Sequence, residues 1–469
     1  MSVDWSFVRL KDYCTKIGSG STPRGGANVY LDSGNVCLIR SQNIYNDGFS
    51  ENGLVFISDS DAEKLNNVEI ELNDVLINIT GDSVARVCLA PKDKLPARVN
   101  QHVAIIRTVK NELDPKFVRY FLTDRNTQNH LLTLAGTGAT RNALTKGMLE
   151  EFLVPKPDIL IQKKISKILS DLDEKIHLNN QINQTLESIA QTIFKSWFID
   201  FEPVRAKIAA KQEGTDTELA AMCAISGKSE AELKQMAEDD LAELQATAAL
   251  FPEELVESEL GEVPKGWEIL DIDKTTSLII DHRGKTPKKL GSDWSDTGIT
   301  VLSAKHIKDG YIVNREQLRF VDRELYNKWM KEELEEGDIL LTSEGPMGEM
   351  YYLASDEKYC LSQRLYALRA NTDLISSAFI YFWLLSPYAK SDMNGRATGT
   401  TVVGIRQSEL RKVKVLTPPK NICDLFNEKV KANLKQIALN NNKSVDLAHI
   451  RDILLPKLMA GDLTLSVGC

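Results

Sequence analysis

Several short motifs in this 469-residue sequence contain residues that could do chemistry, but each lacks a part that the chemistry needs. The loop "GSGSTPRGG" (18–26) has the glycines of a phosphate loop without the Gly-Lys-Ser/Thr that supplies a lysine and a metal ligand. The tripeptide "DEK" occurs at 173–175 and 356–358. It resembles the carboxylate–lysine end of the metal-binding motif of some nucleases. The first copy lies in a predicted helix, where i,i+4 charge pairing explains it better. The six histidines have no H-E-x-x-H spacing for a zinc ion. We therefore predict no catalytic residue, no metal site and no cofactor in this chain.

What remains is a set of loops rich in Ser, Thr, Asn, Gln and Arg. Such side chains donate to phosphate oxygens and read base edges, with Arg suited to guanine and Asn or Gln suited to adenine. The loops therefore indicate nucleic-acid binding. For any single residue, a solvated turn side chain is about as good an explanation.

These loops occur in equivalent places of a duplicated sequence. "TGATRNALTKGMLEEFLVPKP" (137–157) returns as "TGTTVVGIRQSELRKVKVLTP" (398–418), with seven pairs of residues at one offset of 261. Five further segments repeat, and the offset stays between 261 and 264 throughout, for example in "VNQHVAIIR" (99–107) and "LSQRLYALR" (361–369). A period this long is not that of a solenoid. It indicates one domain present twice.

Each copy contains signals for both strands and helices. The alternating runs "DVLINIT" (74–80) and "GDILLTS" (337–343) predict strands. The segment "DPKFVRYFLTDRNTQNHLLTLA" (114–135) predicts a helix. We therefore predict two similar mixed α+β domains with many Gly- and Asn-containing turns.

The duplication continues past each domain into a long helical segment. Residues 164–198 align with residues 425–459, still at the offset of 261. Apolar residues at 3/4 spacing and central asparagines predict that the two helices pair with each other, because a buried Asn fixes register and partner. Pro456 should end or kink the second helix. The predicted seam residues are Ile165, Leu169, Leu172, Ile176, Asn179, Leu186, Ile193, Ile437, Asn440, Leu447 and Leu454.

The formal charge of −9 is concentrated in one segment. Residues 203–264 carry 5 basic and 14 acidic side chains, a difference that equals the charge of the whole chain. The segments on either side are nearly neutral, so charge neither indicates nor excludes DNA binding. We predict that this Ala/Glu-rich connector is helical in pieces and faces a protein partner or solvent, because phosphate would repel it.

The composition is that of an ordinary globular protein. No apolar run reaches the roughly 18 residues that cross a bilayer, and "MSVDWSFVRLKDYC" has neither the basic start nor the apolar core of a signal peptide. The seven cysteines are scattered without a C-x-x-C pair, which argues against a zinc site and a disulfide framework. We predict a cytoplasmic protein that does not bind a membrane.

The predicted order along the chain is domain, long helix, connector, domain, long helix. The two domains span residues 1–158 and 265–420, the helices span residues 159–202 and 421–460, and the connector spans residues 203–264.

With these features the sequence resembles the specificity (S) subunits of type I restriction–modification enzymes over essentially its whole length. The resemblance is carried by "GSGSTPRGG" and its counterpart "DHRGKTPKKLG" (281–291), by the twin "TG" segments, and by the twin asparagine-bearing helices. It is carried also by "WFIDFEPVRAK" (197–207) and "SELGEVPKGWE" (258–268). The motifs are specific only in combination.

The resemblance implies two target-recognition domains, each reading one half of an interrupted sequence in double-stranded DNA. It implies that the paired helices act as a spacer and as the docking surface for two methyltransferase (M) subunits. A motor-nuclease (R) subunit would join for cleavage. S-adenosylmethionine and ATP with Mg²⁺ would then be bound by the partner subunits.

The two helices also predict a geometry. A helix of about 35 to 40 residues is roughly 55 to 60 Å long. Two such helices lying antiparallel as a coiled coil would hold the domains at opposite ends, related by a pseudo-two-fold axis. The DNA half-sites would then lie at a fixed distance with unread base pairs between them. Removing one turn from both helices should change that gap and leave the bases of each half-site unchanged.

The candidate DNA contacts are transferred from the resemblance by loop position. In the first domain they are Ser21, Thr22, Arg24, Arg40, Asn43, Arg86, Gln101 and Arg141. In the second domain they are Arg283, Lys285, Thr286, Lys305, His306, Gln363, Arg364 and Arg396.

Other functions stay open at this level. A stand-alone bipartite DNA-binding regulator would use the same two domains without enzymatic partners. A fused methyltransferase would need an Asn/Asp-Pro-Pro-Tyr/Phe stretch to hold the target amine, and none is present. A purely structural scaffold would show no sequence-selective DNA binding.

Overall fold

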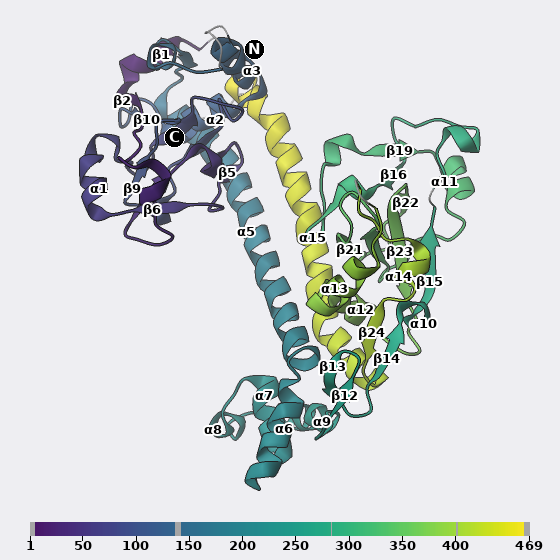
Figure 1. Cartoon of the computed structure of the whole chain (residues 1–469). Coiled ribbons are helices and arrows are strands. Elements are labelled where there is room, and N and C mark those ends of the chain that lie inside the picture. Colours follow the sequence, from purple (N-terminus) through teal and green to yellow (C-terminus); the bar gives the residue numbers. More distant parts are fainter. Residues whose placement is uncertain (1–4, 137–141, 283, 400–401, 464–469) are drawn as a thin grey trace. The chain divides into compact units, whose positions relative to one another are not determined.

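The computed structural model describes residues 5–136, 142–282, 284–399 and 402–463, which form two compact units (Figure 1). Unit 1 consists of Met1–Asn179 with Asn442–Cys469, and unit 2 consists of Asn180–Asn441. Each unit therefore contains one copy of the repeated domain and segments of both long helices.

The domain in unit 1 is built on two small sheets. The strand order is β2–β10–β7–β8 in the antiparallel sheet and β6–β3–β9 in the other, where β3 pairs antiparallel with β6 and parallel with β9. Two further pairs are β1–β11 and β4–β5. The strands are β1 (Phe7–Arg9), β2 (Cys14–Ser19), β3 (Val36–Ile39), β4 (Ile44–Tyr45), β5 (Gly48–Phe49), β6 (Val55–Ile57), β7 (Val75–Asn78), β8 (Val87–Leu89), β9 (Ala97–Val99), β10 (Val103–Thr108) and β11 (Leu153–Pro155). The helices are α1 (Asp59–Lys64), α2 (Pro115–Thr123), α3 (Arg125–Gly136) and α4 (Lys146–Glu150).

The domain in unit 2 repeats this topology strand for strand. Its sheets are β15–β23–β20–β21 and β19–β16–β22, again with one parallel pair, and its small pairs are β14–β24 and β17–β18. The strands are β14 (Glu268–Asp271), β15 (Thr276–Asp281), β16 (Ile299–Leu302), β17 (Ile307–Lys308), β18 (Tyr311–Ile312), β19 (Arg319–Val321), β20 (Ile339–Thr342), β21 (Met350–Tyr352), β22 (Tyr359–Leu361), β23 (Leu365–Ala370) and β24 (Lys414–Thr417). The helices are α10 (Ile272–Thr275), α11 (Arg323–Trp329), α12 (Ser377–Leu385), α13 (Pro387–Arg396) and α14 (Gln407–Leu410). The predicted pair of similar α+β domains is confirmed, and so are the strands predicted in "DVLINIT" and "GDILLTS".

A buried ion pair also occurs in both domains. Arg107 on β10 donates twice to Asp74 at 2.8 Å, and Arg369 on β23 donates twice to Asp338 at 2.9 and 2.8 Å. Both aspartates are only 1% exposed. A buried carboxylate is unfavourable without a partner. The bidentate pairing with Arg107 therefore stabilises the turn before β7, and that with Arg369 stabilises the turn before β20.

The helix predicted over residues 114–135 is in fact two helices, α2 and α3. Asp124 lies between them in an extended conformation, and its carboxylate accepts from the amides of Asn126 at 3.0 Å and Thr127 at 3.3 Å. Asp124 therefore caps α3 instead of continuing α2. In unit 2, Ser386 caps α13 in the same way, through the amide of Ala389 at 3.3 Å.

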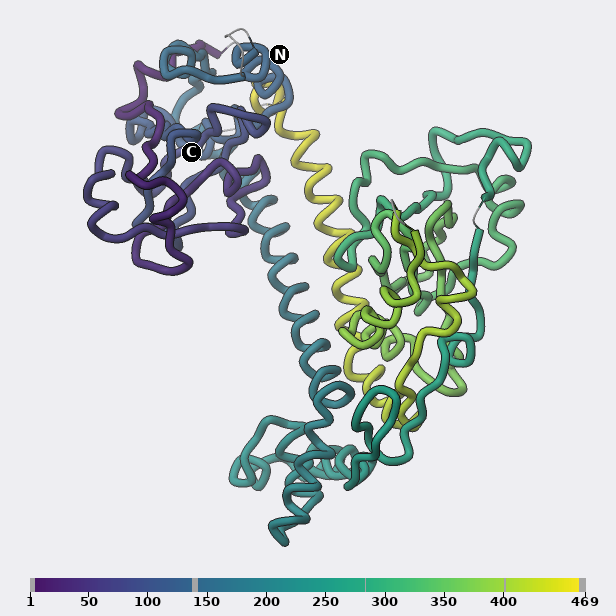
Figure 2. The backbone as a smooth tube through the Cα atoms, in the orientation of Figure 1, coloured from purple at the N-terminus to yellow at the C-terminus, as the bar shows by residue number. Residues whose placement is uncertain are grey.

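The two predicted long helices are confirmed as α5 (Ile159–Phe198) and α15 (Lys420–Met459), each of 40 residues. At 1.5 Å per residue each is about 60 Å long, and Figure 2 traces both as continuous coils. Pro456 does not end α15, because the helix continues to Met459; the alternative, a kink at Pro456, stays a prediction. Leu455 and Leu458 are buried around it in one apolar cluster, and this packing outweighs the amide hydrogen that proline lacks.

Within each unit the segments of α5 and α15 run antiparallel. In unit 1, Asp173 pairs with Arg451 at 2.8 Å, and Asn179 donates to Ser444 at 3.1 Å. A higher residue number on α5 is thus paired with a lower residue number on α15, as expected for antiparallel helices.

Unit 2 has an asparagine cluster between the same helices. Asn183 donates to Asn441 at 2.7 Å and accepts from Asn440 at 2.9 Å. Phe194 and Phe426 stack edge to face further along, with ring centres 5.6 Å apart. The seam residues chosen from the sequence are all buried or half-buried; Asn183, which is 1% exposed, was not among them.

The acidic connector is helical in pieces, as predicted. It forms α6 (Glu202–Glu213), α7 (Thr217–Ser226), α8 (Glu230–Leu233) and α9 (Glu238–Ala249), followed by the hairpin β12 (Leu255–Ser258) and β13 (Gly261–Pro264). Ala221, Met222, Leu233 and Ala248 form a small core of its own. In the part of the chain that the structure describes, no helix is both long and apolar enough to span a bilayer.

Candidate nucleic-acid interface

In unit 1, three turns that are distant in sequence meet around a depression of about 580 Å³. The segment after β3 contributes Ser41, Gln42 and Tyr45, the β7–β8 turn contributes Thr80–Ser83 and Arg86, and the β9–β10 turn contributes His102 with its neighbour Gln101. Asn142 also lines the depression. We call this set of residues edge 1.

The side chains of edge 1 order one another. The amide nitrogen of Gln101 lies 3.0 Å from His102 Nε2, and the hydroxyl of Thr80 lies 2.6 Å from His102 Nδ1. Because an amide nitrogen can only donate, His102 Nε2 accepts and its Nδ1–H donates to Thr80. These two bonds leave the hydroxyl hydrogen of Thr80 and the amide oxygen of Gln101 unused, so edge 1 has a donor for a base or a phosphate and an acceptor for a base.

Arg86 supplies the positive charge of edge 1. Its guanidinium lies 4.6 Å from the centre of the Tyr45 ring, and such stacking holds a flat cation in one orientation. The turn beneath it is supported by α3, since Gln128 donates to the carbonyl of Ala85 at 2.8 Å. Ala85 itself has a φ of 69°, so the turn is tight.

Unit 2 contains the equivalent turns, and we call their matching positions edge 2: Ala304, Lys305, Lys308, Glu344–Met347, Met350, Gln363 and Arg364. The equivalence is visible in the backbone, because Thr80 bridges to Ala143 in unit 1 and Glu344 bridges to Gly404 in unit 2. The side chains differ. Arg364 pairs with Glu344 at 2.8 Å, where edge 1 has His102 bonded to Thr80. Two edges of one shape thus present different chemistry.

A second depression, of about 180 Å³, lies beside edge 2. Its lining includes Trp294, Lys305, Gln317 and Arg319. Arg319 lies over the Trp294 ring with 5.0 Å to its centre, and Lys305 donates to Gln317 at 3.0 Å. A stacked arginine and a lysine on one wall suit an anionic ligand such as a DNA backbone.

The structure places five of the predicted contacts on these edges. Arg86 and Gln101 belong to edge 1, and Lys305, Gln363 and Arg364 belong to edge 2; all five are exposed or half-buried. Ser21, Thr22 and Arg24 lie instead on the loop after β2, and Thr286 lies on the loop after β15.

Three other predicted cations are held by the protein itself. Arg40 donates to the carbonyl of Gly53, Lys285 donates to the carbonyl of Trp329 at 2.7 Å, and Arg396 pairs with Asp392 at 2.7 Å. They can reach DNA only by exchanging these partners.

Two predicted contacts are buried and position the loops. Asn43 is fully buried; its oxygen accepts from the amide of Arg40 at 3.0 Å and its nitrogen donates to Ser50 at 3.0 Å. His306 is 3% exposed and accepts from the amide of Ser303 at 3.1 Å. Burial and the charge of Lys305 lower the pKa of His306, so the ring is neutral at pH 7 and can accept. Neither side chain faces outward, and we do not retain them as DNA contacts.

Arg141 and Arg283 lie outside the described residues. Sequence reasoning also missed several residues of edge 1, because isolated polar residues in turns give no signal of convergence. The missed residues are Gln42, Tyr45, Thr80, Ser83, His102 and Asn142.

The described residues contain no cluster of three or more His, Cys, Asp or Glu side chains that could hold a metal ion. The edges offer hydroxyls, amides, an imidazole and the cations Arg86, Arg364 and Lys305, beside carboxylates such as Asp82 and Glu344. These groups suit recognition of phosphates and bases.

Known proteins resemble the chain in both halves. The type I restriction modification DNA specificity domain matches it twice, over residues 2–188 and 264–447. The type I restriction enzyme HindI specificity subunit of Haemophilus influenzae is 29% identical over 477 residues, covering 98% of this chain and 100% of that protein. The MjaIX specificity subunit of Methanocaldococcus jannaschii is 22% identical, covering 98% and 94%.

A solved structure shares the fold. The type I restriction–modification S subunit from M. genitalium superposes with a TM-score of 0.57 at 14% identity, covering 97% of this chain and 96% of that one. The twofold domain match covers well over half of the sequence. This chain therefore belongs to the family of type I restriction–modification specificity subunits.

Proposed function

We propose that this chain selects the DNA sequence for a type I restriction–modification complex and leaves the chemistry to its partners. Residues 1–158 (reader 1) recognise one half-site through edge 1, and residues 265–420 (reader 2) recognise the other through edge 2. The long helices set the number of unread base pairs between them. The partners are M subunits, an R subunit and double-stranded DNA, and the location is the cytoplasm.

One observation carries this proposal. The same three turns converge in both readers, yet their exposed side chains differ, as Arg364–Glu344 against His102–Thr80 illustrates. The two readers share a backbone but expose different polar side chains, which suits two different half-sites. Side-chain contacts to bases specify the sequence, whereas contacts to the DNA phosphates only set the position of the protein.

The helices support docking of two M subunits. In unit 1, Leu178 and Ile450 are 46% exposed each, and in unit 2 the equivalent Leu439 and Ile189 are 53% and 45% exposed. Large exposed apolar side chains that recur on both helices favour a protein partner. Because each unit has one such leucine and one such isoleucine, we propose one M subunit for each unit.

Two equivalent glutamines test the assignment of half-sites. Gln101 and Gln363 occupy the same turn of the two readers, and both are exposed. The complex of this chain with its M subunits is given DNA libraries randomised at either half-site, and methylation is measured. Gln101→Ala should relax base preference at one position of one half-site by about tenfold, and Gln363→Ala should do so in the other half-site.

Gln212→Ala, which changes an exposed glutamine of the connector, is the matched control and should leave the target unchanged. If either edge variant relaxed both half-sites, or if neither variant relaxed any, the assignment of one half-site to each reader would be wrong.

A further inference from the structure

In each unit the reader meets the long helices at a junction built from equivalent elements. Junction 1 comprises the β4–β5 turn, α2, α5 and α15, around a depression of about 240 Å³. Junction 2 comprises the β17–β18 turn, α12, α5 and α15, around a cavity of about 330 Å³. Arg119, Tyr120 and Thr123 of α2 correspond to Tyr381, Phe382 and Leu385 of α12.

Junction 1 is closed by three charged side chains. Asp173 of α5 accepts from Arg119 of α2 at 2.9 Å and from Arg451 of α15 at 2.8 Å. Tyr120 of α2 adds a hydrogen bond to the same carboxylate at 2.7 Å. Arg119 is 7% exposed, and the side chains of Asp173 and Arg451 are 22% and 21% exposed. One carboxylate thus ties the reader to both helices.

The fold itself does not require these charges, as junction 2 demonstrates. The positions equivalent to Arg119, Asp173 and Arg451 are Tyr381, Leu434 and Ala190. All three are buried in one apolar cluster.

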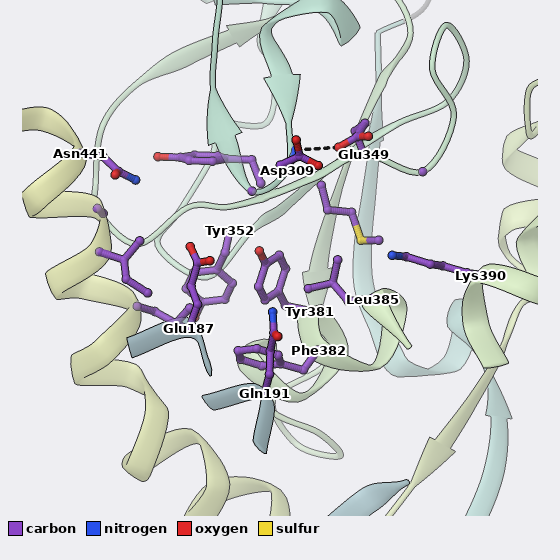
Figure 3. Close-up of a pocket in the computed structure, with 17 residues that line it drawn as sticks. Glu187, Gln191, Asp309, Glu349, Tyr352, Tyr381, Phe382, Leu385, Lys390 and Asn441 are labelled. Atoms are coloured by element: carbon purple, nitrogen blue, oxygen red, sulfur yellow. Dashed lines mark hydrogen bonds between the residues drawn. The ribbon is translucent and has the colours of Figure 1, made fainter. Parts of the chain in front are cut away.

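Junction 2 instead has a cavity, and its β17–β18 turn is joined to a helix by a hydrogen bond. The hydroxyl of Tyr311 donates to Glu187 of α5 at 2.7 Å. Figure 3 shows Glu187, Gln191, Tyr381 and Phe382 around the cavity, which is lined by 17 residues. The reader of unit 2 pairs ionically with α15 at another place, where Glu336 contacts Lys431 and Lys435. Among these equivalent positions, one carboxylate that joins the reader to both helices is a property of junction 1.

The charged group at junction 1 also contacts the turn that leads to edge 1. Arg119 donates to the carbonyl of Asn46 at 2.6 Å, and the side chain of Asn46 accepts from the amide of Val87 at 2.9 Å. Asn46 and Val87 directly follow Tyr45 and Arg86, the stacked pair of edge 1. Hydrogen bonds therefore connect the DNA-reading surface to the helices through one arginine.

We propose that Arg119, Asp173 and Arg451 form an ionic latch that fixes the orientation of reader 1 on the helices, and that Asp173 is thereby a positioning residue for the gap between the half-sites. The proposal rests on the proposed function, because it assumes that reader 1 recognises a half-site. It adds that the preference of the complex for one gap length depends on the contact of Asp173 with Arg119 and Arg451, which lies outside edge 1.

The test measures methylation of duplexes that share both half-sites and differ only in gap length, from two base pairs shorter to two base pairs longer than the natural gap. The complex of the full chain with its M subunits is used. Asp173→Asn keeps the shape of the side chain and removes the charge that holds two arginines. We expect discrimination against gaps changed by one base pair to fall by about tenfold, with unchanged base preference within each half-site.

Asp171→Asn is the matched control, because Asp171 pairs with Lys167 on the exposed surface of the same helix at 2.8 Å. It should leave the gap profile unchanged. Asp173→Glu keeps the charge and should restore most of the discrimination.

A second variant covers the case in which Asp173→Asn fails to fold. Arg119→Tyr, Asp173→Leu and Arg451→Ala together give junction 1 the residues of junction 2, where they pack stably. This triple variant should fold and show the relaxed gap profile. If the folded latch variants kept the wild-type gap profile, the latch would be excluded as a positioning device. If the wild-type complex showed no interrupted target, the proposed function itself would fail.

Discussion

Two carboxylates of α5 respond to burial in opposite ways. Burial by itself raises the pKa of Asp173, but the charge of Arg119 and the hydrogen bonds from Arg451 and Tyr120 outweigh it and hold that pKa below its ordinary value. Burial also raises the pKa of Glu187, and there the hydrogen bond from Tyr311 opposes the shift without cancelling it. The protein therefore stabilises the charged form of Asp173 and disfavours the charged form of Glu187.

The two sites should therefore give opposite results when their charge is removed. Asp173→Asn should lower the free energy of unfolding at pH 7 by about 1.5 to 3 kcal/mol, because it weakens hydrogen bonds between charged groups. Since the folded pKa of Asp173 is depressed, this difference should persist down to the unfolded value of about 4 and disappear only as the pH falls further, through the folded pKa. Glu187→Gln should be neutral or stabilising at pH 7, with a gain that shrinks as the pH falls toward 4.5.

Urea unfolding at pH 7 and pH 4 measures the effect of Glu187→Gln, and unfolding curves that continue below pH 4 measure the loss of the Asp173 contribution. An equal loss of stability from Asp173→Asn and Glu187→Gln at pH 7 would contradict the described environments. Asp171→Asn serves again as the surface control, with an expected change within about 0.5 kcal/mol.

Residue type and loop position predicted part of the candidate site. Arg86, Gln101, Gln363 and Arg364 lie on the edges, because the internal repeat places their turns in register. Asn43 has an equally suitable side chain, yet it is buried as a loop support. The sequence could not separate these cases, since a polar turn residue satisfies either its own backbone or a ligand.

At the scale of elements, the asparagines between the helices should be coupled. Asn183 and Asn440 are 1% and 4% exposed and bond to each other at 2.9 Å. Removing either leaves the other amide buried without its partner, which costs about 1 to 3 kcal/mol. The double variant Asn183→Ala with Asn440→Ala should cost less than the sum of the single variants by about 1 kcal/mol.

A double-mutant cycle of chemical unfolding checks this coupling. Asn180→Ala, at an exposed position of the same helix, provides the control and should change stability little. Strict additivity of the two single variants would mean that the asparagine cluster does not specify how the helices pair.

The long helices and the duplicated sheets could be predicted because both leave periodic traces in the sequence. The offset of 261 alone predicts the equivalence of α5 and α15, which begin at Ile159 and Lys420. The break at Asp124 and the helical turn after Pro456 could not be predicted in this way. The first depends on a side-chain cap and the second on packing of Leu455 and Leu458, and neither has a period.

At the scale of the whole molecule, the chain is one reader-and-helix sequence used twice. The equivalent junctions differ in chemistry, with Asp173 and Arg451 in unit 1 where unit 2 has Leu434 and Ala190. The two readers are therefore alike in fold and distinct in the groups that anchor them. This predicts that the readers can be exchanged if their anchoring residues are exchanged too.

The most direct test of the central claim replaces residues 265–419 with a copy of residues 4–158, which preserves the offset of 261. Leu434→Asp and Ala190→Arg are included so that the copied Arg119 meets the partners it has in unit 1. Methylated adenines are then mapped in the genome of a host that produces this chain with its M subunits. We predict an interrupted target whose two halves are the same sequence on opposite strands, because the helix segments run antiparallel. A target that kept two different halves would contradict the claim that each reader selects its own half-site.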